Sequence, residues 1–176
     1  MIRDEEIKRL SNYIKGLGLK VIFTSSTKGD EAASWATDNS EIVINTRNND
    51  SKIDIVMSMI HEIGHALHNL WEKNREPDRK FEEALDHTYE AEELGLDTKK
   101  RQRKVILENE IAGTRYWEAT YKETNMKFPI WRLYANMEFD IWQYEVYSET
   151  GIFPNNSERT KKMKEIAAKH KRKKYD

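Results

Sequence analysis

The first third of the chain combines one helical pattern with three short apolar runs. Residues Asp4–Gly16 repeat apolar side chains at spacings of three and four, which predicts an amphipathic helix that ends at Gly16 or Gly18. The runs that follow are rich in β-branched and aromatic residues, as strands are. The predicted strands are Leu19–Phe23, Ala33–Thr37 and Glu41–Asn45. We therefore expect a small sheet near the N-terminus.

Beyond the turn-forming residues Asn48–Ser51, the apolar spacing becomes helical. Helices are predicted over Lys52–Asn74, Arg101–Asn125, Ile130–Thr150 and Ser157–Lys174. Residues 75–100 are highly charged, which indicates a helical excursion outside the main core. This order predicts an α+β fold, mostly helical, with one small N-terminal β-sheet. We expect one domain over residues 1–155 and a basic C-terminal helix over residues 156–176.

Composition restricts the class of protein. The 176 residues include five Trp, eight Tyr and five Phe, which argues against disorder. The absence of cysteine excludes disulfide scaffolds, cysteine-ligated zinc and thiol catalysis. No apolar run is long enough to span a membrane, and the charged N-terminal residues are unlike a secretory signal. We therefore expect a cytoplasmic protein with no membrane partner.

Charge is distributed unevenly along the chain. The net charge is −1, but residues 159–176 contain nine Lys or Arg and two acidic residues, a balance of +7. The rest of the chain therefore carries −8. Such a basic tail can contact nucleic acid or an acidic partner. A solvated terminal helix is the simpler interpretation, and we favour it.

The segment Ile60–His68 carries the most informative motif. His61 and His65 are four residues apart, so on a helix both imidazoles project from one face and can hold one metal ion. Glu62 lies one step round the helix, where it can accept a proton from a water molecule bound to that ion. This H-E-x-x-H pattern occurs in an amphipathic helix that follows a predicted strand. It indicates a hydrolytic metal site with Glu62 as general base.

Two histidines do not complete a catalytic zinc site, which takes three protein ligands and keeps one position open. The metzincin pattern would place Gly at position 68 and His at position 71, but this chain has His68 and Trp71. His68 follows one turn after His65, so we expect it to support the site from behind or to lie at the surface. The remaining option for the third ligand is a carboxylate from another segment. The candidates are the acidic pair Glu108 and Glu110 and, more remotely, Glu90 and Glu92.

These residues resemble a known family. The chain is similar to zincin-fold metallopeptidases of the gluzincin type, and closest to the ImmA/IrrE-like metallo-endopeptidases of phages and mobile elements. In that family a strand leads into a helix with H-E-[IL]-G-H. A later helix carries a motif close to E-x-E-A-[DN], whose first Glu completes the zinc site. The resemblance covers roughly residues 35–70 and 104–120.

The resemblance implies roles for individual residues. His61 and His65 match the zinc ligands, Glu62 matches the general base, and Glu108 matches the third ligand. It also implies a zincin-like fold, a Zn²⁺ cofactor and a peptide or protein substrate.

The chain departs from the family pattern after Glu108. The family places Asp or Asn four residues later, to hold a ligand histidine by its other ring nitrogen, whereas this chain has Ala112. Either another group supplies that hydrogen bond, or Glu110 is the ligand and Thr114 stands four residues after it. We favour Glu108 and keep Glu110 as the alternative.

Further roles follow from the chemistry of a peptidase. It needs a donor for the oxyanion that forms when water attacks the carbonyl. The available donors are Tyr116, Arg115, Tyr134 and His87. In zincins the strand before the metal helix, here Glu41–Asn45, is the sheet edge with which an extended substrate pairs. An ordinary edge strand is an equal alternative. We assign Trp117, Trp131, Phe139 and Trp142 to the core.

These observations lead to three hypotheses about function, which differ in the class of protein. In the first, the chain is a zinc-dependent endopeptidase that hydrolyses peptide bonds, with a regulatory protein among its candidate substrates. In the second, it is a zincin-like regulatory protein with weak peptidase activity, which binds a repressor or contacts nucleic acid through its basic tail. A purely structural metal site is a third alternative. Glu62 argues against it, because a structural site needs four protein ligands and no general base.

Overall fold

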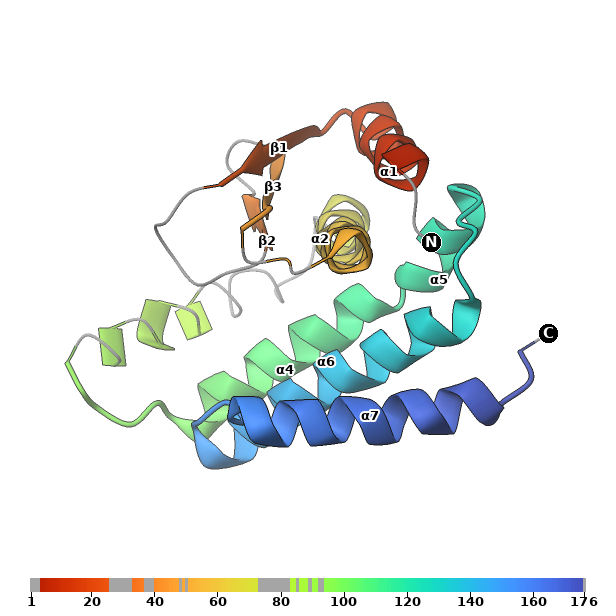
Figure 1. Ribbon diagram of the computed structural model, residues 1–176. Helices are drawn as coiled ribbons and strands as arrows, with labels where there is room; N and C mark the ends of the chain where they lie inside the picture. The colour runs from red at the N-terminus through yellow and green to blue at the C-terminus, as the bar shows by residue number, and fades with distance from the viewer. Residues whose placement is uncertain are drawn as a thin grey trace. The chain divides into compact units, whose positions relative to one another are not determined.

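The computed structural model describes residues 4–25, 33–36, 40–47, 49, 51–72, 83–84, 86–88, 90–91 and 94–175. These residues form helices and one three-stranded sheet, so the α+β prediction is confirmed (Figure 1). The chain divides into two compact units, Met1–His68 with Gly113–Pro129 and Asn69–Ala112 with Ile130–Asp176. The boundary expected at residue 155 stays a prediction. None of the described helices has the length and apolar character that a membrane span requires.

Helix α1 (Asp4–Gly16) begins the first unit and ends in a Schellman motif. The N–H of Leu19 donates to the carbonyl of Ile14 (3.1 Å), and the N–H of Gly18 donates to that of Lys15 (3.0 Å). Gly18 has a φ of 78°, a left-handed conformation in which a Cβ would be strained. Ile14 and Leu19 are both buried. This termination leads the chain directly into the first strand.

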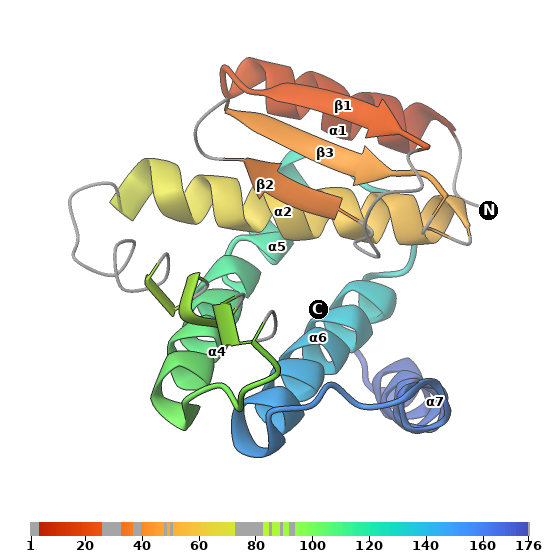
Figure 2. The ribbon, with the colours of Figure 1, turned by 90° about the vertical axis from the view of Figure 1, so that its left-hand side faces the viewer.

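The strands are β1 (Lys20–Thr24), β2 (Ala33–Ala36) and β3 (Glu41–Asn45). Their order in the sheet is β1-β3-β2, with β1 parallel and β2 antiparallel to β3. Figure 2 shows β3 between the other two strands, with α1 and α2 covering the far face of the sheet. The prediction that Glu41–Asn45 is an edge strand is therefore wrong. Its hydrogen-bonding groups on both sides are used in strand pairing, so it offers no ladder to a substrate.

Helix α2 (Lys52–Glu72) packs behind this sheet. The backbone N–H of Asp54 donates to Ser51 Oγ (3.4 Å), as expected where serine caps a helix. On β3, Ile42 and Ile44 alternate with more exposed residues and are fully buried. The buried apolar stripe of α2 includes Val56, Ile60, Ile63 and Leu67. This stripe fixes the rotation of α2 and so decides where its histidines project.

The predicted helix over Arg101–Asn125 is interrupted. The structure has α4 (Lys100–Thr114) and α5 (Trp117–Glu123) in its place. At the break, the N–H of Tyr116 donates to the carbonyl of Gly113 (3.2 Å), a turn tighter than an α-helix. No proline occurs at this break, and the apolar periodicity alone did not predict it.

Helices α6 (Ile130–Thr150) and α7 (Asn156–Arg172) belong to the second unit and lie side by side. Asn155 caps α7 by accepting from the N–H groups of Ser157 and Glu158, and the Glu158 carboxylate accepts from the N–H of Asn155. Buried side chains from both helices meet, with partly buried aromatic residues around them. This cluster consists of Ala135, Phe139 and Ile166, bordered by Trp131, Trp142 and Met163. The core assignment is thus confirmed for Phe139, whereas Trp131 and Trp142 are partly buried.

Of the predicted excursion, residues 75–100, the structure describes residues 83–84, 86–88, 90–91 and 94–100. Residues 83–84, 86–88 and 90–91 are described and helical. Ala84 is buried against Ile106 of α4 and Tyr147 of α6. This part of the segment therefore contributes to a core cluster of the second unit, which corrects the expectation that it lies outside the core.

Candidate metal centre

His61 and His65 stand one turn apart on α2 and face each other. Their Nε2 atoms are 3.0 Å apart, and their ring centroids are 4.7 Å apart in an edge-on arrangement. Both residues are partly buried. Two nitrogen ligands of one tetrahedral zinc ion lie about 3.3 Å apart when each Zn–N bond is about 2.0–2.1 Å. The imidazoles are therefore arranged much as a shared metal ion requires.

A carboxylate from α4 joins the two histidines. One ligand atom from each of His61, His65 and Glu110 can be chosen so that all lie within 4.8 Å of one another. Glu110 is 7% exposed. A buried carboxylate is costly unless charged or polar groups compensate it. Two imidazoles and one carboxylate are a donor set that divalent transition metals favour.

Glu110, the alternative candidate for the third ligand, belongs to this group. Glu108, the preferred candidate, does not. Glu108 is exposed. Two residues correspond to about 200° of helix rotation, so Glu108 and Glu110 leave α4 in nearly opposite directions. Of the more remote candidates, Glu90 is exposed and Glu92 lies outside the described residues. Glu110 therefore replaces Glu108 as the candidate third ligand.

Glu62 is buried beside this group, with 6% of its surface exposed. Its Oε1 atom lies 3.9 Å from His61 Nε2, one of the atoms that face His65. The sequence predicted a carboxylate next to the histidines but outside the ligand set, and the structure has Glu62 in that position. Its expected role as general base stays a prediction.

Two glycines allow α2 and the last turn of α4 to approach closely. A Cβ on Gly64 would lie 2.5 Å from the Gly113 carbonyl oxygen, and a Cβ on Gly113 would lie 3.0 Å from the His65 ring. A Cβ on Gly64 would therefore clash with the Gly113 backbone, and a Cβ on Gly113 would force the His65 ring or the helix to shift by a few tenths of an ångström. The Gly113 backbone thus packs directly on the imidazole of His65 and limits its rotation.

Trp117 similarly limits the rotation of the His61 imidazole. Its ring centroid lies 5.5 Å from that of His61 in an edge-on contact, and the residue is 1% exposed. The break between α4 and α5 places Trp117 at the start of α5, against Gly64. The assignment of Trp117 to the core is confirmed. The apolar pattern did not predict its contact with His61. Two glycines, one inside the histidine motif and one near the acidic pair, were the signal of close helix packing.

His68 is not a member of the metal group, but it is buried, with 5% of its surface exposed. Its ring centroid lies 6.4 Å from that of Tyr116 in a tilted arrangement. The surface alternative for His68 is therefore wrong. Its role in supporting the site stays a prediction.

The four candidate oxyanion donors have different surroundings. Arg115 is exposed, and Tyr116 is partly buried beside His68. His87 accepts a hydrogen bond from the backbone N–H of Lys99 (3.4 Å). Tyr134 belongs to an aromatic stack of the second unit, next to His170. Tyr116 is thus the candidate that contacts a residue of the α2 histidine segment.

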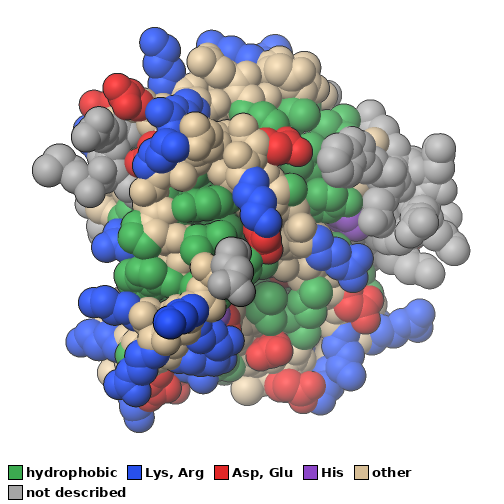
Figure 3. Space-filling model, turned by 90° about the vertical axis from the view of Figure 1, so that its right-hand side faces the viewer, with side chains coloured by type: hydrophobic (Ala, Val, Ile, Leu, Met, Phe, Trp, Pro, Cys, Tyr) green, Lys and Arg blue, Asp and Glu red, His purple; other side chains and the backbone are tan. Residues whose placement is uncertain are grey.

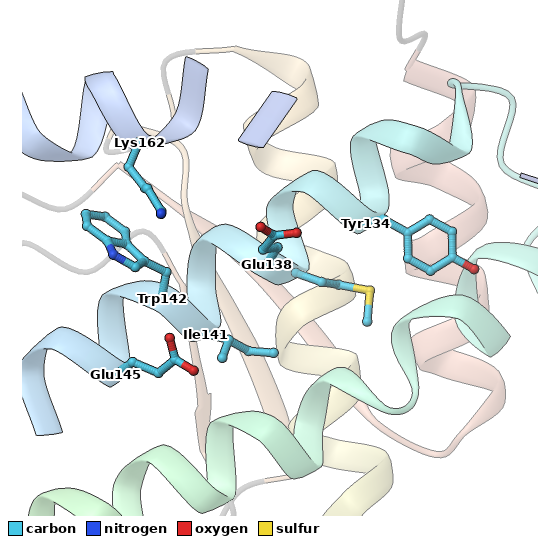
Figure 4. A pocket seen from close by; sticks show the side chains of 7 residues that line it. Tyr134, Glu138, Ile141, Trp142, Glu145 and Lys162 are labelled. Atoms are coloured by element: carbon cyan, nitrogen blue, oxygen red, sulfur yellow. The ribbon is translucent and has the colours of Figure 1, made fainter. Parts of the chain in front are cut away.

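A separate shallow cavity of about 350 Å³ lies on α6 and α7 (Figure 4). Its lining combines aromatic, aliphatic and acidic side chains with one lysine. These residues are Tyr134, Met137, Glu138, Ile141, Trp142, Glu145 and Lys162. None of them belongs to the histidine–carboxylate group, so the cavity and the candidate metal centre are different features.

Comparisons of the chain with protein-family models, with curated proteins and with solved structures find no match.

Proposed function

We propose that the chain is a zinc-dependent metallopeptidase in which His61, His65 and Glu110 hold the metal. The observation that carries this proposal is the convergence of these three side chains, with ligand atoms within 4.8 Å of one another. The donor set supports zinc, because two histidines and one glutamate are a ligand combination of catalytic zinc sites. The buried Glu62 beside the group supports a hydrolytic site over a purely structural one.

Zinc bound by such a donor set supplies Lewis-acid activation of a water molecule and of a carbonyl group. Glu62 accepts the proton of the attacking water and passes it to the leaving amine. Trp117 and Gly113 position the metal ligands. Their contacts with His61 and His65 hold the two imidazoles in place before the metal or a substrate binds. The proposed substrate is a peptide or protein.

The metal assignment is tested by measuring zinc stoichiometry, with elemental mass spectrometry on protein purified without a chelator or a polyhistidine tag. Glu110→Gln and Glu108→Gln are a matched pair, since each removes one carboxylate from the same helix. We expect about one zinc per chain in the wild type and in Glu108→Gln. In Glu110→Gln we expect the affinity for zinc to fall more than about 100-fold, which exceeds the loss typical of residues that only hydrogen-bond to a metal ligand. Zinc retained in Glu110→Gln and lost in Glu108→Gln would restore Glu108 as the ligand.

The reaction is tested by hydrolysis of fluorescein-labelled casein with zinc present. Glu62→Gln keeps the shape of the side chain but removes its basic oxygen. We expect this variant to bind zinc like the wild type and to cleave at least about 100-fold more slowly, the usual contribution of a general base. Equal rates would refute the role of Glu62. A wild type that binds zinc but leaves casein intact would favour the regulatory alternative.

A further inference from the structure

The basic C-terminal segment is a docked helix. Glu138 on α6 accepts hydrogen bonds from Lys169 Nζ (2.7 Å) and pairs with His170 Nε2 (2.7 Å). His170 is buried, its other ring nitrogen contacts the Tyr175 hydroxyl, and its ring stacks on Tyr134. Together with the Asn155 cap, these contacts hold both ends of α7. Its cations are therefore presented from a fixed helix.

Helix α7 has two distinct sides. Met163, Ile166 and His170 face α6 and are wholly or partly buried. The opposite side carries four exposed cations, which are Lys161, Lys164, Lys171 and Arg172. We refer to these four as the outer basic face. Figure 3 shows a dense group of Lys and Arg side chains at the lower left of the face that it presents.

Among the described residues, acidic side chains do not neutralise the outer basic face. Lys169 pairs with Glu138, and Lys162 lies over the ring of Trp142, 5.7 Å from its centroid (Figure 4). In the part of the chain that the structure describes, no acidic side chain pairs with Lys161, Lys164, Lys171 or Arg172. The rest of the chain carries a net charge of −8, yet the acidic side chains that the structure describes leave these four cations unpaired.

We propose that the outer basic face binds the phosphate backbone of duplex nucleic acid. The four cations span eleven residue steps, or about 16 Å of helix. A duplex carries one phosphate per about 3.4 Å of axis on each strand, so this length faces about four or five phosphates of one strand. Along the helix axis the cations form two pairs, Lys161 with Lys164 and Lys171 with Arg172, about 10 Å apart, so the two pairs can contact phosphates at two places on one stretch of backbone. Contacts of this kind give affinity without reading the base sequence.

The chemistry of the face favours nucleic acid over a membrane. A helix that lies on a membrane inserts large apolar residues beneath its basic ones. On α7 the apolar side already packs against α6, and between Lys161 and Arg172 the other exposed positions hold Glu165, Ala168 and Lys169. The proposal is independent of the metal centre, since it uses no residue of that group.

The test is fluorescence anisotropy of a labelled 20-base-pair duplex of mixed sequence, titrated with the full chain at 50 to 200 mM salt. The variant replaces Lys161, Lys164, Lys171 and Arg172 with Gln. We expect the slope of log affinity against log salt to be shallower in the variant by about 3.6, since each phosphate contact contributes about 0.9. When salt rises from 50 to 200 mM, these four contacts alone lower the affinity of the wild type for the duplex by about 150-fold.

A control variant removes the same charge from other exposed positions, through Lys8→Gln, Lys15→Gln, Arg101→Gln and Lys104→Gln. We expect it to keep the wild-type salt dependence. The proposal is overturned if the two variants lose affinity equally, or if the wild type does not bind the duplex at 50 mM salt. It is also overturned if phosphatidylserine vesicles or polyglutamate bind the chain more tightly than the duplex does. Those results would assign the face to a membrane or to an acidic protein.

Discussion

At the scale of single residues, Gly113 links helix packing to the candidate metal centre. Gly113→Ala places a methyl group 3.0 Å from Cε1 and Nδ1 of His65, so the imidazole or the helix must move. We expect zinc affinity to fall by about 10- to 100-fold, as for other groups that orient a ligand. The free energy of unfolding should fall by about 1–3 kcal/mol. Competition with a chromophoric chelator measures the first quantity, and urea denaturation measures the second.

Gly16→Ala is the matched control for that substitution. Gly16 is exposed at the end of α1, and a Cβ there would meet nothing within 4 Å. Its zinc affinity should equal that of the wild type. If Gly113→Ala also binds zinc normally, the glycine contact does not position His65.

The residues of the candidate centre differ in how far the sequence could predict them. His61, Glu62 and His65 share one helix, so their relative positions follow from helix geometry and need no tertiary information. The choice between Glu108 and Glu110 depends on the rotation of α4 about its own axis. The acidic pair has one member on each side, and α4 has a weak apolar stripe, so its sequence does not settle the rotation.

At the scale of elements, Glu138 connects α6 to α7 and makes this docking sensitive to pH. Burial alone would raise the pKa of Glu138, but hydrogen bonds from Lys169 and His170 outweigh it and hold the pKa below its usual value. A carboxyl group with a lowered pKa in the folded state stabilises the protein above its unfolded pKa of about 4.3, and this contribution is lost as pH falls below that value. Acid should therefore weaken the attachment of α7.

Glu138→Gln tests that docking. The side chain is partly exposed, so at pH 7 we expect it to lower the free energy of unfolding by only about 1 kcal/mol. The difference from the wild type should shrink as pH falls from 5 towards 3, because protonation then removes the charge from the wild type as well. Urea denaturation at several pH values measures this. A difference that stays constant over the whole range would show that the charge of Glu138 is not involved.

The elements themselves were largely predictable, but their arrangement was not. The strands and the long helices follow from local periodicity, and Ile130–Thr150 has its predicted bounds. The central position of β3 arises because β1 pairs with it in parallel and β2 in antiparallel fashion, and strand order is a long-range property. The break after Thr114 is stabilised by the burial of Trp117 in the first unit, which is also a tertiary effect.

At the scale of the whole molecule, the net charge of −1 conceals a separation of charge along the chain. Composition revealed that the last 18 residues are basic, but it did not distinguish a free tail from a docked helix. The structure decides this through the Asn155 cap and the contacts of α7 with α6. A docked helix loses little further conformational entropy on binding a polyanion, so its cations are better prepared for binding than those of a flexible tail.

Metal removal should also change the stability of the whole chain. The proposed ligands come from segments 45 to 49 residues apart in sequence, so an ion that binds all three favours the folded over the unfolded state. At a free zinc concentration 100 times the dissociation constant, this linkage contributes about 2.7 kcal/mol. For a chain of this size that corresponds to a melting temperature about 5–11 °C higher with zinc than with EDTA. Differential scanning calorimetry measures the shift. Glu108→Gln should keep the shift and Glu110→Gln should lose most of it, because the stabilisation depends on the carboxylate that joins the two histidines. If all three proteins show the same melting temperature with zinc and with EDTA, the convergent side chains do not form a metal site.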